Sequence, residues 1–133
     1  MTHRLVRWAL AALYAVAAAA HLLTPAPFIA IVPGWVPWPA AVVALTGVAE
    51  GLGALALVQP WSARLRRAGA IGLALYALCV WPANFNHLLL DLARTDGGGL
   101  PLAYHLARLA AQPPVIWAAL WAGGVTDWPF RRR

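Results

Sequence analysis

The chain has 133 residues, of which 62% are hydrophobic and 11% are charged, and its formal net charge is +6. Soluble domains carry about 25% charged residues, so this composition cannot cover a globule with polar surface. It excludes an ordinary soluble domain and predicts a membrane protein whose residues 1–133 form one domain. The single cysteine, Cys79, excludes an internal disulfide and a thiolate metal site, and the single serine, Ser62, excludes a serine-nucleophile hydrolase. We expect Cys79 to be a buried packing thiol, and we predict no metal site.

Four apolar stretches follow one another along the chain, at residues 5–23, 40–59, 68–90 and 101–125. Each reaches or approaches the ~20 residues that an α-helix needs to cross about 30 Å of hydrocarbon. The predicted fold class is therefore all-α, a bundle of four transmembrane helices. The first stretch shares its basic start and small residues with cleaved secretory signals. Because its apolar run continues through Leu22 and Leu23, we expect it to be retained as a span.

The arginines are distributed unevenly between the two ends of these stretches. Eight arginines precede the first stretch, separate the second from the third, or follow the fourth. They are Arg4, Arg7, Arg64, Arg66, Arg67 and Arg131–Arg133. The other two, Arg94 and Arg108, fall on the opposite side. By the positive-inside rule, this asymmetry places both termini in the cytoplasm. The basic charge then reflects topology, and no nucleic-acid partner is expected. Absent lysine and abundant Ala, Gly, Pro and Arg suggest a GC-rich bacterium, hence its cytoplasmic (inner) membrane.

Residues 24–39 separate the first two stretches and contain five prolines, no charge, and the aromatic residues Phe28, Trp35 and Trp38. The prolines forbid a continuous helix. Tryptophan rings favour the interface between membrane and water. We expect this segment to anchor at the outer interface and to cap the polar site partly. A dedicated lid is the alternative interpretation.

Glu50 is the most informative residue, because it lies in the middle of an otherwise apolar stretch. A carboxylate near the bilayer midplane costs about 2.5–3.5 kcal/mol on insertion scales, so it needs a partner or a function. Gly47 and Gly51 form a GxxxG pair beside it, with Ala54 on the same face. Small residues at this spacing allow close helix packing, so Glu50 is predicted to face the bundle interior.

The third and fourth stretches each present a row of polar residues on one helical face. In the third, Asn84 and His87 follow Tyr76 and Val80, and Pro82 predicts a kink. In the fourth, His105, Arg108 and Gln112 share a face, and Pro113–Pro114 predict a bend. A rise of 1.5 Å per residue places Glu50 about 18 Å, Arg108 about 10 Å and Gln112 about 16 Å along their helices.

Polar side chains from all four helices thus converge on the outer half of the membrane. The candidate ligand pocket consists of His21, Glu50, Asn84, His87, Arg108 and Gln112. Each residue also has a structural interpretation. His21 and His105 suit the interface, Asn84 and Gln112 suit interhelical hydrogen bonds, and Arg108 suits the headgroups. Glu50 is either ionised and paired, with Arg108 as its cation, or protonated and hydrogen-bonded. A Glu50–Arg108 pair would serve helix packing or a ligand, proton or electron-carrier site.

The chain resembles the DoxX-like family of small four-helix bacterial membrane proteins. The resemblance covers nearly the whole chain, in family order. It is carried by AAHLLTPAPFIAIVP (19–33), TGVAEGLGALAL (46–57), RLRRAGAIGL (64–73), WPANFNH (81–87) and ARLAAQPPVIWA (107–118). His21, Glu50, Asn84, Arg108 and Gln112 match the family's polar positions, whereas Ala110 stands where a proline is expected. The resemblance implies a link to quinone-coupled thiosulfate oxidation or to membrane oxidoreductase complexes.

Three functions remain open. In the first, the chain is a membrane subunit of a quinone-linked redox system. Glu50, Arg108 and His21 then handle protons and carbonyl hydrogen bonds, and Trp81 or Trp117 stacks on the ring. The electron donor is a separate soluble or membrane partner, and haem between His21 and His87 is disfavoured. In the second, the chain binds or transports a small lipophilic ligand without chemistry. In the third, it is a scaffold or assembly factor, and whether it is an enzyme is left open.

Overall fold

The computed structural model describes residues 2–129, and helices account for most of this stretch. Four helices are long and one is short, and residues 2–129 contain no strand. The helices are α1 (Thr2–Leu23), α2 (Ala26–Ala30), α3 (Pro39–Val58), α4 (Ala63–Leu92) and α5 (Leu102–Ala122). The predicted all-α fold class is confirmed. Arg131–Arg133, which contribute to the predicted topology, lie outside the described residues.

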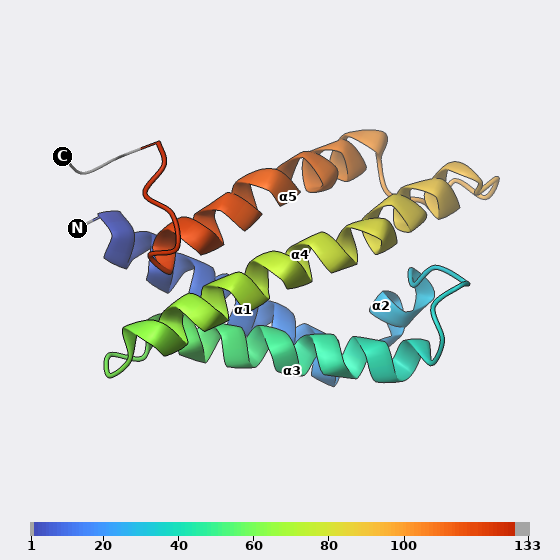
Figure 1. Ribbon diagram of the computed structural model, residues 1–133. Helices are drawn as coiled ribbons and strands as arrows, with labels where there is room; N and C mark the ends of the chain where they lie inside the picture. The colour runs from blue at the N-terminus through green and yellow to red at the C-terminus, as the bar shows by residue number, and fades with distance from the viewer. Residues whose placement is uncertain (1, 130–133) are drawn as a thin grey trace.

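The long helices form an up-and-down bundle in which α1 packs on α3, α3 on α4, and α4 on α5 (Figure 1). The start of α1, the end of α5 and the turn between α3 and α4 lie at one end of the bundle. The segment with α2 and the turn between α4 and α5 lie at the other end. We call this second end the α2 end. The short connections between α3 and α4 and between α4 and α5 make these helices antiparallel neighbours, whereas the longer segment 24–38 joins α1 to α3.

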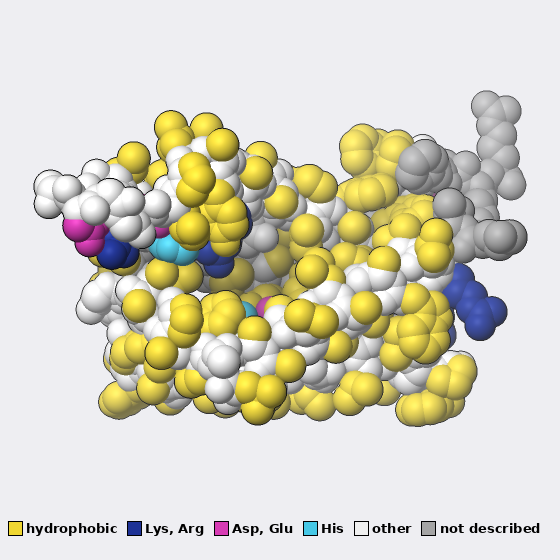
Figure 2. Space-filling view, turned by 180° about the vertical axis from the view of Figure 1, so that it is seen from behind, with side chains coloured by type: hydrophobic (Ala, Val, Ile, Leu, Met, Phe, Trp, Pro, Cys, Tyr) yellow, Lys and Arg dark blue, Asp and Glu magenta, His cyan; other side chains and the backbone are white. Residues whose placement is uncertain are grey.

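Three helices are long and apolar enough to cross a membrane: His3–Leu23, Pro39–Val58 and Ala63–Leu92. They match three predicted spans, although the third is longer at both ends than residues 68–90. Many large apolar side chains on these helices are exposed, Leu5, Leu45 and Leu75 among them. The surface seen in Figure 2 is correspondingly dominated by hydrophobic groups. A membrane protein is the class that such a surface indicates, because soluble monomers rarely expose apolar area of this extent.

Small residues allow α3 and α4 to cross closely. A Cβ atom added to Gly69 would overlap the Cβ of Ala56, and one added to Gly53 would overlap the Leu73 side chain. Leu57 and Leu73 fill the adjacent core and are almost completely buried. Close backbone approach of this kind is how helices gain packing contacts where lipid supplies no hydrophobic driving force.

The sharp turn between α3 and α4 is held by Gln59, a buried polar residue that the sequence analysis did not identify. Its Nε2 donates to the carbonyls of Ala56 (3.2 Å) and Ser62 (2.7 Å), and its Oε1 accepts from the Ser62 amide (2.9 Å). The Ser62 hydroxyl in turn accepts from the Leu65 amide at 3.1 Å and caps the first turn of α4. The side chains of Gln59 and Ser62 thus provide partners for backbone groups at the end of α3 and the start of α4 that have none within a helix.

The prolines inside the helices do not end them, since α4 continues through Pro82 and α5 through Pro113 and Pro114. Pro82 has no N–H to donate to the carbonyl one turn earlier, so α4 lacks one intrahelical hydrogen bond there. Beside this position, the carbonyl of Ala77 accepts a hydrogen bond of 2.9 Å from Gln112 Nε2 of α5. This bond joins the two proline-containing regions across the α4–α5 interface.

Residues 24–38 form no continuous helix, as their prolines predict, and α2 is a single short turn within them. The segment is tied to α4 by Asn86, whose Nδ2 donates to the carbonyl of Ile31 at 2.9 Å. Phe28, Ile31 and Trp35 then lie along the cavity described below. The segment therefore covers part of the cavity, and its anchoring at the outer membrane interface stays a prediction.

Candidate functional site

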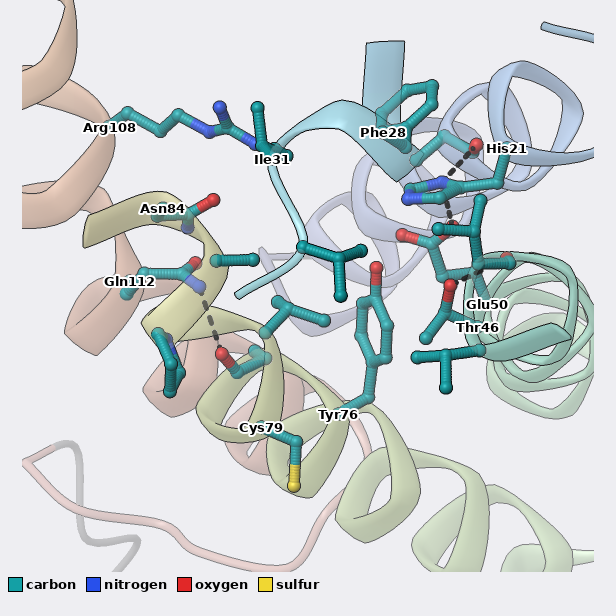
Figure 3. A pocket seen from close by; sticks show the side chains of 18 of the residues that line it. His21, Phe28, Ile31, Thr46, Glu50, Tyr76, Cys79, Asn84, Arg108 and Gln112 are labelled. Carbon is teal, nitrogen blue, oxygen red and sulfur yellow. Dashed lines mark hydrogen bonds and ion pairs between the residues drawn. The ribbon is translucent and has the colours of Figure 1, made fainter. Parts of the chain in front are cut away.

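A cavity of about 380 Å³ lies between the α1–α3 pair and the α4–α5 pair, toward the α2 end (Figure 3). All four long helices and the segment with α2 contribute to its lining. In Figure 2 it is seen as a hollow with acidic and histidine atoms at its floor. Five of the six predicted pocket residues line it: His21, Glu50, Asn84, Arg108 and Gln112. Most other lining residues are apolar, and the volume falls within the 300–1,000 Å³ typical of small-molecule sites.

Gly47 brings His21 and Glu50 together on one wall of the cavity. A Cβ atom at position 47 would approach the Cβ of His21 to 2.9 Å, so α1 reaches this depth only against glycine. His21 Nδ1 consequently lies 2.9 Å from Oε2 of Glu50, whose side chain is 3% exposed. The glycine spacing thus has a direct consequence for the site, because it positions the pair across the α1–α3 interface.

The same His21 Nδ1 also lies 2.8 Å from the carbonyl oxygen of Ala17. A carbonyl only accepts, so Nδ1 must be the nitrogen that has a proton. That one proton faces two acceptors, the Ala17 carbonyl and the Glu50 carboxyl group. Stacking on Phe28 at a centroid distance of 3.9 Å fixes the ring plane. When the ring is neutral, Nε2 is an acceptor available to a group in the cavity, which His21 lines.

Tyr76 of α4 approaches Glu50 from the opposite side. Its hydroxyl points toward the Glu50 carboxyl group in Figure 3, and the two groups interact electrostatically. Its ring meets that of Tyr14 edge-on, with centroids 6.3 Å apart. The buried carboxyl group of Glu50, on α3, is therefore approached by one side chain from α1 and one from α4.

The predicted Glu50–Arg108 pair does not form. Arg108 lies on the far wall of the cavity, where its Nη1 is 3.0 Å from His87 Nδ1. The prediction failed because depth along a helix does not fix which helices adjoin across a cavity. Glu50 and Arg108 both border the space, but each is paired with a neighbour on its own side.

Asn84 and Gln112 complete the far wall. Asn84 is 6% exposed and lines the cavity, while Gln112 donates its Nε2 hydrogen to α4 and keeps its Oε1 as an acceptor. Gln112 therefore makes the interhelical hydrogen bond that its sequence position suggested, and it also lines the cavity. The two walls together offer donors and acceptors on opposite sides of an otherwise apolar space.

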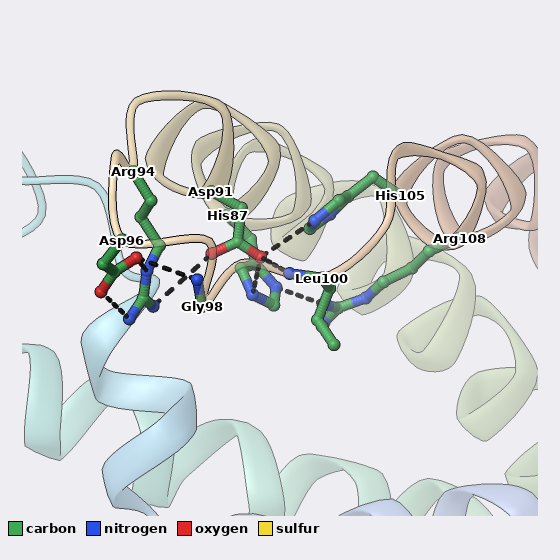
Figure 4. A network of polar contacts seen from close by, with 8 residues as sticks. All are labelled: His87, Asp91, Arg94, Asp96, Gly98, Leu100, His105 and Arg108. Atoms are coloured by element: carbon green, nitrogen blue, oxygen red, sulfur yellow. Dashed lines mark hydrogen bonds and ion pairs between the residues drawn. The ribbon is translucent and has the colours of Figure 1, made fainter.

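The sixth predicted residue, His87, lies outside the cavity lining and belongs to a network at the α2 end (Figure 4). Asp91 is its centre. Oδ2 of Asp91 lies 3.4 Å from His87 Nε2, 3.0 Å from His105 Nε2 and 2.9 Å from the Leu100 amide, which donates to it. Arg108 joins this network to the cavity, because it contacts His87 and lines the pocket.

The turn between α4 and α5 has its own ion pair between Arg94 and Asp96. The two hydrogen bonds from Arg94 measure 3.1 and 3.2 Å, and the Gly98 amide donates to Asp96 at 3.0 Å. The Arg94 guanidinium, together with the Gly98 N–H, lowers the pKa of Asp96 to about 2. Asp96 is therefore ionised throughout the neutral range, and it compensates the charge of Arg94.

Several members of the site differ from those that the sequence predicts. Tyr76 was a predicted neighbour of Asn84 on one helical face, but its contact with Glu50 was not foreseen. The tryptophan at the cavity is Trp35, whereas neither Trp81 nor Trp117 lines it. Cys79 is exposed rather than buried, and it borders the cavity. These errors share a cause: helical periodicity identifies a face, but the packing of the bundle decides what that face meets.

The sequence matches the family described as "Domain of unknown function (DUF8561)" over residues 10–123. The match includes every residue of the cavity lining and most of the chain, so the chain belongs to this family. No curated protein and no solved structure is significantly similar to it.

Proposed function

We propose that this DUF8561 member binds a lipophilic molecule with a polar ring, of the quinone class, as a membrane subunit of a quinone-linked redox system. The observation that supports this most is the two-walled cavity. Its apolar lining suits a ring and the start of a hydrocarbon tail, and titratable and amide side chains stand on opposite walls. The DUF8561 match does not connect the chain with DoxX-like proteins, so the resemblance to them remains part of this proposal.

A quinone head group has carbonyl oxygens on opposite sides of its ring, and these become hydroxyls on reduction. On the far wall, Arg108 and Asn84 supply N–H donors for a carbonyl. On the near wall, His21 Nε2 and the Glu50 carboxyl group supply acceptors for a hydroxyl and a place for its proton. The pocket would thus engage both oxidation states of such a ring, and electrons would come from a separate partner protein. Haem between His21 and His87 is not part of the proposal, because His87 lies outside the cavity that His21 lines.

A second candidate is a binding or transport protein that performs no reaction. This candidate is favoured because polar groups of the cavity already contact other groups of the protein. His21 contacts Glu50, and Gln112 donates to the Ala77 carbonyl. In a general lipophile binder, these contacts would persist with the ligand in place, and ring carbonyls would add no affinity. The two candidates therefore differ in whether the carbonyl groups are recognised.

Binding of a decyl-tailed benzoquinone is the direct test. Trp35 borders the cavity, so saturable quenching of tryptophan fluorescence is expected in detergent, and Trp35→Phe should remove the saturable part. His21→Ala and Asn84→Ala should each weaken binding by about tenfold, since one hydrogen bond contributes about 1–1.5 kcal/mol. Gln59→Ala is the matched control: it lowers stability at the α3–α4 turn and leaves the affinity unchanged.

Decylbenzene, which has no carbonyl groups, separates the two candidates when it competes against the benzoquinone. If decylbenzene competes at least about tenfold more weakly than the benzoquinone itself, the carbonyl oxygens are recognised. Equal displacement favours the general binder. Absence of saturable quenching in the wild-type chain would leave both candidates without support.

We also propose that α5 is a fourth span, with both termini in the cytoplasm of a bacterium whose inner membrane holds the chain. The 21-residue length of α5 is sufficient for crossing, and it runs alongside α4 in the bundle. Arg4, Arg7, Arg64, Arg66 and Arg67 all belong to the end opposite the α2 end, as the positive-inside rule requires of a cytoplasmic side.

Reporter fusions test this orientation. A phosphatase active only outside the cytoplasm should give activity when fused after Gly98 and none when fused after Arg133. Activity at both sites would mean that α5 does not cross. Activity at Arg133 with none at Gly98 would invert the topology.

A further inference from the structure

Among the described residues, one group of three side chains presents metal-binding atoms to a common point: His87, Asp91 and His105. The group lies at the α2 end and outside the cavity lining. His87 and Asp91 are one helical turn apart on α4, and His105 comes from the first turns of α5. One ligand atom from each lies within 4.8 Å of the others. Asp91 and His105 are largely buried, with side-chain exposures of 9% and 2%.

The separations approach those of a tetrahedral metal site. Zn–N and Zn–O bonds of about 2.0–2.2 Å place neighbouring ligand atoms about 3.3–3.5 Å apart. Asp91 Oδ2 lies 3.0 Å from His105 Nε2 and 3.4 Å from His87 Nε2. The third separation, at most 4.8 Å, must shorten by up to about 1.5 Å, and the shortest must lengthen slightly, for all three atoms to meet one ion. A site of two imidazoles and one carboxylate binds transition metal ions in preference to Mg²⁺, which favours oxygen ligands.

We propose that His87, Asp91 and His105 form a binding site for a divalent transition metal ion of the Zn²⁺ class. The site has three protein ligands and leaves a fourth position open, as in catalytic rather than purely structural zinc sites. The proposal is independent of any ligand in the cavity. It also goes beyond the sequence, because the two histidines come from different helices and meet only when the turn between α4 and α5 closes.

Arg108 gives the proposal a distinctive consequence. Its guanidinium can only donate, so His87 Nδ1 accepts from it and the neutral ring has its proton on Nε2, facing Asp91. Ligation through Nε2 moves that proton to Nδ1, where it meets the donors of Arg108. The metal-bound state therefore separates Arg108 from His87, and the arginine opposes metal binding. Removing Arg108 should tighten the site.

Isothermal titration with ZnCl₂ tests the site on full-length protein in detergent, stripped with chelator and purified without a histidine tag. One equivalent of Zn²⁺ is expected to bind and to raise the unfolding temperature, whereas MgCl₂ has no effect. His105→Gln and His87→Gln keep an amide N–H for Asp91 but should weaken Zn²⁺ binding by at least about tenfold. His3→Gln, at the opposite end of the bundle, is the matched control and should bind like wild type.

Arg108→Ala is the discriminating variant, since it should bind Zn²⁺ more tightly than wild type. Absence of stoichiometric Zn²⁺ binding overturns the proposal. So does wild-type affinity in both glutamine variants, or weaker binding in Arg108→Ala. Asp91→Asn replaces either glutamine variant that fails to fold, as judged by its elution and circular dichroism, and it should lose Zn²⁺ binding to the same extent.

Discussion

Replacing Glu50 by alanine is expected to lower the free energy of unfolding in detergent by about 1–3 kcal/mol, the cost of leaving a buried partner without its hydrogen bond. The affected partners are His21, 2.9 Å away, and Tyr76. His21→Ala should lose a similar amount, because it also removes the stack on Phe28. The double variant should lose less than the sum, with a coupling energy of about 0.5–3 kcal/mol. Denaturant titration of the four proteins measures this coupling.

A second cycle with Arg108 is the matched control. Arg108 contacts His87 rather than Glu50, so the losses in Glu50→Ala and Arg108→Ala should add to within about 0.5 kcal/mol. Strong coupling in this cycle, or none between Glu50 and His21, would contradict the pairing described here. The two cycles together show whether Glu50 interacts with His21 or with Arg108.

Gly69→Ala is expected to destabilise the bundle by about 1–3 kcal/mol, although alanine is the better helix former by about 1 kcal/mol. The added Cβ overlaps that of Ala56, which is fixed to the backbone of α3 and cannot rotate away. The helices must therefore separate at their crossing. Thermal unfolding in detergent measures the loss.

Two further variants show whether the steric contact is the cause. Gly72→Ala lies one turn farther along α4, where an added Cβ meets no atom within 4 Å, and it should be neutral or stabilising. Ala56→Gly combined with Gly69→Ala should recover most of the stability, because the new Cβ then meets the Cα of residue 56 at 3.6 Å. Equal losses at positions 69 and 72 would point to helix propensity instead of packing.

The candidate site was partly predictable. Glu50 was identified by its depth in an apolar stretch, and the depth count correctly grouped it with His21, Asn84, Arg108 and Gln112 around one space. Their pairings were not predictable. Depth depends only on the rise per residue, whereas a pairing depends on how each helix is rotated about its axis and on which helices adjoin.

The sequence by itself determined the helical class, the apolar spans and the depth of each polar residue. These follow from composition, from a 1.5 Å rise per residue, and from the cost of exposing backbone groups to lipid. The tertiary structure decided that Glu50 meets His21, because Gly47 lets α1 approach, and that Arg108 turns to His87. It also brought His105 to Asp91 by closing the turn after α4. These contacts join different helices, so they exist only once the bundle has packed.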